Sequence, residues 1–124
     1  MKSANDSEDR YLFAVYDGET IVANCFLEFL TNIKTKHRGR IGIAVTSNYR
    51  GMGIGSLLFD EMISIARNRN GVTQLELEVI KENERAKRLY TSKGFVKTGD
   101  RPRVLKLPNG TYLDEEMMIL YLDR

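Results

Sequence analysis

A chain of 124 residues is long enough for one compact hydrophobic core and too short for two, so every motif is interpreted as part of one domain, residues 1–124. Hydrophobic residues make up 42% and charged residues 29% of the chain, a balance that excludes an intrinsically disordered protein. The formal net charge is only +2 and the basic residues are spread along the chain, which argues against a dedicated nucleic-acid-binding protein.

The first nine residues are polar, and we expect residues 1–9 to form a flexible lead. They contain no apolar stretch of the signal-peptide kind, and no window of the chain is long enough to cross a bilayer. Cys25 is the only cysteine, so a disulfide within the chain is excluded. These features predict a cytoplasmic protein without a membrane partner.

Two runs of β-branched and aromatic residues, 11–16 and 21–30, flank the dipeptide Asp17-Gly18. An Asp-Gly pair between such runs predicts an antiparallel hairpin. A basic segment over 34–40 follows and is interpreted as the solvated approach to a short apolar strand at 41–45.

Apolar spacing and turn residues predict the elements beyond this strand. They are a glycine-rich loop (46–55), a helix (57–70), a strand (75–79), a helix (83–93) and two final strands (95–107 and 112–122). The predicted fold class is α/β (α+β), a mixed and mostly antiparallel sheet of about six strands with two main helices.

The glycine-rich segment Arg50-Gly51-Met52-Gly53-Ile54-Gly55-Ser56 lies between a predicted strand and a predicted helix. Unpaired backbone N–H groups and the positive end of the helix dipole make such a place suitable for phosphate oxygens. A plain glycine-rich turn is the alternative. The segment lacks the Gly-Lys-Ser/Thr of a P-loop and has GxGxG in place of the GxGxxG of dinucleotide folds.

This segment resembles the acetyl-CoA signature [QR]-x-x-G-x-[GA] of the GNAT N-acetyltransferase superfamily, which is met here by Arg50, Gly53 and Gly55. The stretch from Asn83 to Phe95 is similar to the second motif of that family, N-x-x-A-x-x-L-Y-x-x-x-G-F. Members usually begin with a further strand and two helices that wall part of the acceptor site. Only about ten residues precede the first predicted strand here, so the chain resembles a short member lacking most of those elements.

The resemblance implies that acetyl-CoA is the cosubstrate and binds where the central strands splay apart. In this arrangement the pantetheine arm pairs with the backbone of the strand at 41–45, and the N–H of Val45 faces the thioester oxygen. The residues assigned to the coenzyme are Ile43, Ala44, Val45, Arg50, Gly51, Met52, Gly53, Ile54, Gly55, Ser56 and Asn83. Arg85 and Arg88 lie on the second predicted helix, near the expected path of the nucleotide end.

Two residues are the catalytic candidates. Tyr90 matches the family's tyrosine that hydrogen-bonds the thioester sulfur, and the alternative is a core tyrosine on the apolar face of its helix. Glu78 lies where some members place the glutamate that deprotonates the amine, and the alternative is a solvated carboxylate of an alternating strand. Other carboxylates that remain open as the base are Glu76, Glu28, Asp114 and Glu115.

The sequence therefore predicts an N-acetyltransferase that moves acetyl from acetyl-CoA to a primary amine of a small molecule, amino acid or peptide by direct attack. Because the N-terminal elements are short, a non-catalytic acetyl-CoA-binding regulatory module is the alternative, and a binder of another nucleotide is a second. No cluster of His, Cys and Asp has metal-ligand spacing, so no metal is expected. An incomplete sheet edge favours a homodimer.

Overall fold

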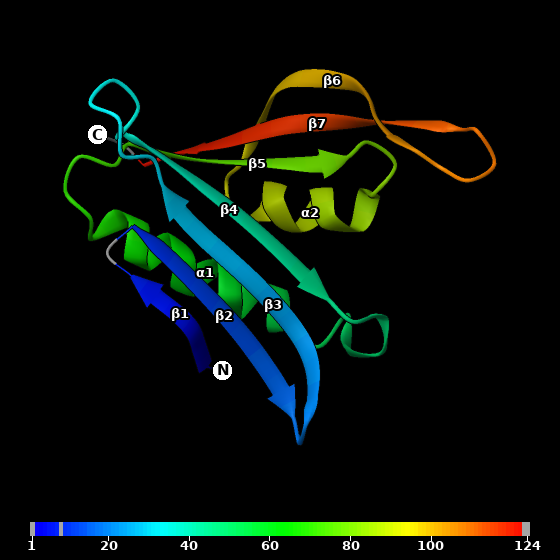
Figure 1. Cartoon of the computed structure of the whole chain (residues 1–124), viewed down its shortest axis with the longest axis horizontal. Helices are drawn as coiled ribbons and strands as arrows, with labels where there is room; N and C mark the ends of the chain where they lie inside the picture. The colour runs from blue at the N-terminus through cyan, green and yellow to red at the C-terminus, as the bar shows by residue number, and fades with distance from the viewer. Residues whose placement is uncertain (1, 8, 123–124) are drawn as a thin grey trace.

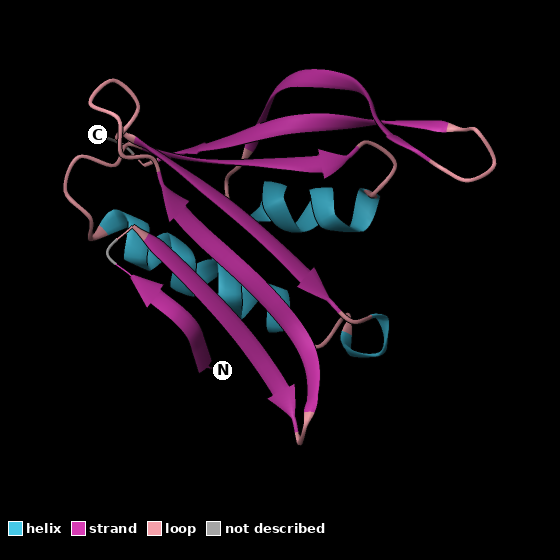
Figure 2. Cartoon of the chain, viewed as in Figure 1, coloured by secondary structure: helices cyan, strands magenta, loops and turns pink. Residues whose placement is uncertain are grey.

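The fold is one mixed sheet with two helices packed against it, seen in a computed structural model that describes residues 2–7 and 9–122 (Figures 1 and 2). The strands of the described residues follow the order β1-β2-β3-β4-β5-β7-β6. In chain order the elements are β1 (Lys2–Ser7), β2 (Arg10–Asp17), β3 (Thr20–Phe29), β4 (Arg38–Val45), a 3-10 turn η1 (Ser47–Tyr49), α1 (Ile54–Arg67), β5 (Gln74–Ile80), α2 (Glu84–Ser92), β6 (Val96–Lys106) and β7 (Tyr112–Tyr121).

The predicted fold class is confirmed, since every pair of neighbouring strands except β4 and β5 is antiparallel. The sheet has seven strands instead of about six because residues 2–7, expected in a flexible lead, pair with β2 from Lys2↔Ala14 to Ser7↔Arg10. The outer edge of β2 offers unpaired N–H and C=O groups, and a polar segment satisfies them as well as an apolar one. Residues 1 and 8 of the expected lead lie outside the described residues.

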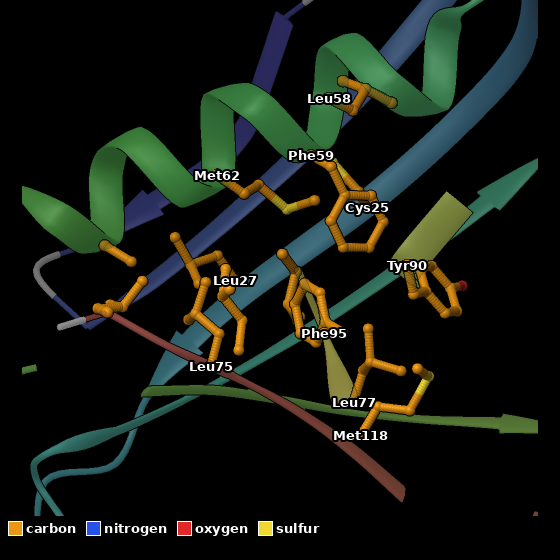
Figure 3. Packing of buried hydrophobic residues seen from close by; sticks show 14 of the residues in the cluster. Cys25, Leu27, Leu58, Phe59, Met62, Leu75, Leu77, Tyr90, Phe95 and Met118 are labelled. Carbon is orange, nitrogen blue, oxygen red and sulfur yellow. The ribbon is translucent and has the colours of Figure 1, made fainter. Parts of the chain in front are cut away.

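Both helices cover the same face of the sheet, and the core lies between them and the strands (Figure 3). Along β5 the burial alternates: Leu75, Leu77 and Val79 are buried, whereas Glu76 and Glu78 lie on the opposite face. Neither helix in the described part of the chain is long and apolar enough to cross a membrane. The sheet therefore has a helix-covered face and an open face among these residues.

Charged pairs on the open face explain why β4 begins at Arg38 and not at Ile41. Arg38 donates from Nε and Nη2 to the two carboxylate oxygens of Glu76, at 2.6 and 2.7 Å. Arg40 is the next residue of β4 on the same face as Arg38, and its Nη2 lies 3.4 Å from Oε1 of Glu78. The basic residues expected in a solvated approach are thus partly strand residues that pair across to β5.

The parallel contact between β4 and β5 is short. Pairing covers only Arg38↔Gln74, Gly39↔Leu75 and Arg40↔Glu76, after which the two strands diverge (Figure 1). The rest of β4 stays paired with β3 up to Ala23↔Val45, and the rest of β5 stays paired with β7 up to Ile80↔Glu115. A V-shaped gap therefore opens inside the sheet toward the carboxyl ends of both strands.

Candidate functional site

A cavity of about 730 Å³ lies at the wide end of this gap, between β4, the N-terminus of α1 and helix α2. It brings together two separate parts of the sequence, residues 43–56 and 83–90. Its lining consists of Ile43, Ala44, Val45, Tyr49, Arg50, Gly51, Gly53, Ile54, Gly55, Ser56, Asn83, Arg85, Ala86, Leu89 and Tyr90. Among the residues that the sequence assigned to the coenzyme or to catalysis, Met52 and Glu78 are not part of the lining, and neither is Arg88 of the second helix.

The free edge of β4 presents backbone groups to the gap. Thr46 N–H donates to Val22 C=O at 2.8 Å and Leu30 N–H donates to Arg38 C=O at 3.1 Å. Because alternate residues of an antiparallel strand bond the same neighbour, even-numbered residues of β4 face β3 and odd-numbered ones face the gap. The peptide groups of Ile43 and Val45 therefore point to the gap.

Ala44 differs from its two neighbours by the same alternation. It lines the cavity, but its peptide groups face Asn24 of β3, its partner in the ladder. The Val45 carbonyl is occupied as well, because Arg50 Nε donates to it at 3.2 Å. The groups of this strand end that remain for a ligand are both peptide groups of Ile43 and the N–H of Val45.

The N-terminus of α1 is open toward the cavity. The helix begins after Gly53, whose φ of 81° is left-handed, and its first internal bond runs from Leu57 N–H to Gly53 C=O at 3.1 Å. No side chain of the described residues caps this end, and its first turn has no acidic residue. The N–H groups of Ile54, Gly55 and Ser56 are therefore unpaired within the helix, and the dipole favours an anion there.

Arg85 and Tyr49 complete the surroundings of this loop. A Cβ at Gly51 would lie 3.1 Å from Nη2 of Arg85, so this guanidinium reaches from α2 to the loop. The hydroxyl of Tyr49 donates to Oδ2 of Asp17 at 2.6 Å, which ties η1 to the turn between β2 and β3. Sequence reasoning missed Tyr49, because nothing before the loop motif distinguishes it from a solvated tyrosine.

The side chain of Tyr90 is shared between the core and the cavity. Its ring packs on Phe59 and Phe95, with centroids 5.1 and 6.3 Å apart, and the residue is 7% exposed. Figure 3 shows its oxygen at the end of the ring turned away from Phe95 and Leu77. Burial raises the pKa of the phenol above its usual value, so the hydroxyl stays protonated near neutral pH. The packing of Tyr90 in the core is confirmed, and its catalytic role stays a prediction.

Asn83 closes the cavity at the N-terminus of α2. Its Oδ1 accepts a hydrogen bond from Ala86 N–H at 3.2 Å and caps the helix. The amide nitrogen of the same side chain is then the group left to donate. Because Oδ1 is held by the helix, the orientation of that donor is fixed.

Glu76 and Glu78 lie on the other side of the sheet from Tyr90. Hydrogen bonds from Arg38 are the main cause that lowers the pKa of Glu76, which therefore holds a proton poorly. Glu78 lies nearer the wide end of the gap and has longer contacts, 3.4 and 3.5 Å from Nη2 of Arg40. The role of Glu78 as the base stays a prediction, since Glu78 does not line the cavity.

Two of the other candidate carboxylates, Glu28 and Asp114, contact groups outside the cavity lining. Oε2 of Glu28 lies 3.8 Å from Nε of Arg10, and Oδ1 of Asp114 accepts from Arg103 N–H at 2.9 Å. Over residues 2–7 and 9–122 no three His, Cys, Asp or Glu side chains gather as a metal site would require. The hydroxyl, amide and guanidinium groups of the cavity lining can form hydrogen bonds with a ligand.

Solved structures share this architecture. An acetyltransferase of the GNAT family from Streptococcus pneumoniae superposes with a TM-score of 0.84 at 25% identity, covering 93% of this chain and 68% of that one. The yncA protein of Salmonella typhimurium, solved with its cofactor acetyl-CoA, superposes with a TM-score of 0.78 at 22% identity, over 93% of this chain and 66% of that one. The second match concerns the fold alone.

Sequence relatives agree. The L-amino acid N-acetyltransferase of Escherichia coli (strain K12) is 30% identical over 109 residues, 88% of this chain and 66% of that protein. An uncharacterised protein of Mycobacterium leprae is 44% identical over 61 residues, which are 49% of this chain and 16% of that protein. The chain therefore spans no more than about two thirds of either relative.

The family model that matches the chain covers residues 2–95, which include the splayed strand β4, the glycine loop and the cavity-lining residues of α2. This chain belongs to the acetyltransferase (GNAT) family.

Proposed function

We propose that the chain is an acetyl-CoA-dependent N-acetyltransferase that acts by direct attack of a primary amine, carried by a small molecule, an amino acid or a peptide. One observation carries this proposal: the gap between β4 and β5 leads into a cavity that ends at the uncapped N-terminus of α1. Support comes from the Salmonella yncA protein, which has the same fold and is solved with acetyl-CoA. The E. coli relative is named for L-amino acids, which carry an amine of the proposed kind.

The lining fits the chemistry of the coenzyme. The unpaired N–H groups of Ile54, Gly55 and Ser56, with the nearby Arg85 guanidinium, suit a pyrophosphate. The free N–H and C=O of Ile43 suit an amide of a pantetheine arm, which adds to β4 as a short strand would, and this leaves the N–H of Val45 for the thioester carbonyl. A cavity of about 730 Å³ is within the usual size of small-molecule sites.

Three groups of the chain divide the reaction. The N–H of Val45 donates to the thioester carbonyl oxygen and stabilises the negative charge that develops there. The hydroxyl of Tyr90 donates its proton to the departing sulfur, for which a raised pKa keeps it protonated. Glu78 accepts the proton of the amine, directly or through one water, from the open face of the sheet. Acetyl-CoA supplies the activated acetyl group when it is bound.

The first test is thermal unfolding of the chain with acetyl-CoA, CoA, ATP and NAD in separate samples. A ligand at about a hundred times its dissociation constant stabilises by about 2.7 kcal/mol, which raises the midpoint by several degrees. We expect a rise with acetyl-CoA and CoA only, followed by amine-dependent release of CoA thiol. Absence of a rise with either ligand refutes the proposal. A rise without turnover on any amine supports a regulatory module instead.

A further inference from the structure

Lys93 joins the C-terminal end of α2 to the first two turns of α1. Its Nζ lies 2.7 Å from Oγ of Ser56 and 2.7 Å from Oδ1 of Asp60. The lysine side chain is only 16% exposed, whereas that of Asp60 is 61% exposed. The ammonium is therefore held between the helices and not extended into solvent.

The contact with Ser56 dictates where the serine proton goes. A lysine ammonium has three donors and no acceptor, so Oγ of Ser56 must accept from Lys93. The single hydroxyl proton of Ser56 then has to be donated to another group. Among residues 2–7 and 9–122 no hydrogen bond from this hydroxyl to a protein acceptor is formed, and Ser56 lines the cavity beside the open helix end.

We propose that Lys93 is a positioning residue that fixes Ser56 as a hydrogen-bond donor to the pyrophosphate of the coenzyme. The inference rests on the proposed function, because it needs the pyrophosphate at the N-terminus of α1. A pyrophosphate oxygen can only accept, so it matches a hydroxyl whose proton is directed away from the Lys93 ammonium. The negative charge of Asp60 offsets the positive charge of the Lys93 ammonium. Lys93 therefore contributes to coenzyme binding by orienting Ser56 and not by its net charge.

The test compares the variants Lys93→Met, Ser56→Ala and the double variant in their binding of CoA and of pantetheine, which lacks the pyrophosphate. A hydrogen bond to a charged group is worth enough that each single variant should bind CoA about tenfold more weakly. Pantetheine binding should stay within about twofold, because neither residue touches that arm. The double variant should bind CoA no more weakly than Ser56→Ala, since Lys93 acts through Ser56.

Two control variants separate this role from a structural one. Lys93→Arg keeps a donor and should restore CoA binding, whereas Asp60→Asn removes the ion pair and should leave CoA binding within about twofold. The proposal is overturned if Lys93→Met weakens CoA and pantetheine equally, or if the losses of the single variants multiply in the double variant. Thermal unfolding identifies a variant that fails to fold. If Lys93→Met fails to fold, CoA binding by Asp60→Asn still shows whether loss of the ion pair alone weakens binding. If the wild-type chain binds no CoA, the proposed function itself has failed.

Discussion

Replacement of Tyr90 by Phe removes one hydroxyl and leaves the packing of the ring on Phe59 and Phe95. A general acid typically contributes about 10²–10⁴ in rate, and a thiolate with a pKa near 8.5 is already a fair leaving group. We therefore expect a loss near the lower limit, about 100-fold in kcat, which equals about 2.7 kcal/mol of transition-state stabilisation. The dissociation constant of acetyl-CoA should change by less than about twofold, because the hydroxyl acts on the leaving sulfur.

The assay follows CoA thiol release at saturating amine, with thermal unfolding in parallel. No hydrogen bond of the Tyr90 hydroxyl to a described protein group is seen, so its removal should lower the free energy of unfolding by under about 1 kcal/mol. Tyr121→Phe is the matched control, because Tyr121 is 55% exposed at the far end of β7 and lies outside the cavity. A turnover of Tyr90→Phe within about twofold of the wild type refutes the acid role.

Three further predictions follow from the carboxylates and the cysteine. Glu78→Gln should lower turnover by about 100-fold near neutral pH, and an unchanged turnover would assign the base elsewhere. Glu76→Gln should cost about 1 kcal/mol of unfolding free energy at pH 7. Arg38 lowers the pKa of Glu76, so this stabilisation is present above the pKa that Glu76 has in the unfolded chain. It is lost as the pH falls through the lower pKa of the folded chain. The free energies of unfolding of the wild type and the variant, measured at decreasing pH, should therefore converge. Burial raises the pKa of Cys25 to about 11, so its thiol should react with a disulfide reagent only on unfolding, and rapid labelling of the native chain would contradict its burial.

The elements with strong local signals were predictable from the sequence. Asp17-Gly18 marked the first hairpin, and strict alternation marked β5. Strand β1 was not predictable, because residues 2–7 are polar and their pairing depends on the exposed edge of β2, which no local pattern records. The start of β4 at Arg38 was missed for a similar reason, since its basic residues need the carboxylates of β5 to lie in a sheet.

The site was predictable where a motif fixes backbone geometry. The glycine loop and Asn83 lie where the sequence indicated, because glycine and a capping side chain act locally. Ala44 shows the limit, since only the ladder with β3 decides which peptide groups face the gap. Lys93 shows it too, because its partner Ser56 is 37 residues away and no spacing rule joins them.

Three residue pairs between β4 and β5, with the bond from Thr73 N–H to His37 C=O just before them, join two half-sheets, β1 to β4 and β5 to β6, in the described chain. Each half-sheet leads directly into one helix of the cavity, α1 after β4 and α2 after β5. A ligand in the gap would therefore contact both half-sheets beyond this short stretch of pairing. Its binding would hold the ends of β4 and β5 in place. Amide hydrogens at the ends of both strands should therefore exchange more slowly when a ligand is bound in the gap.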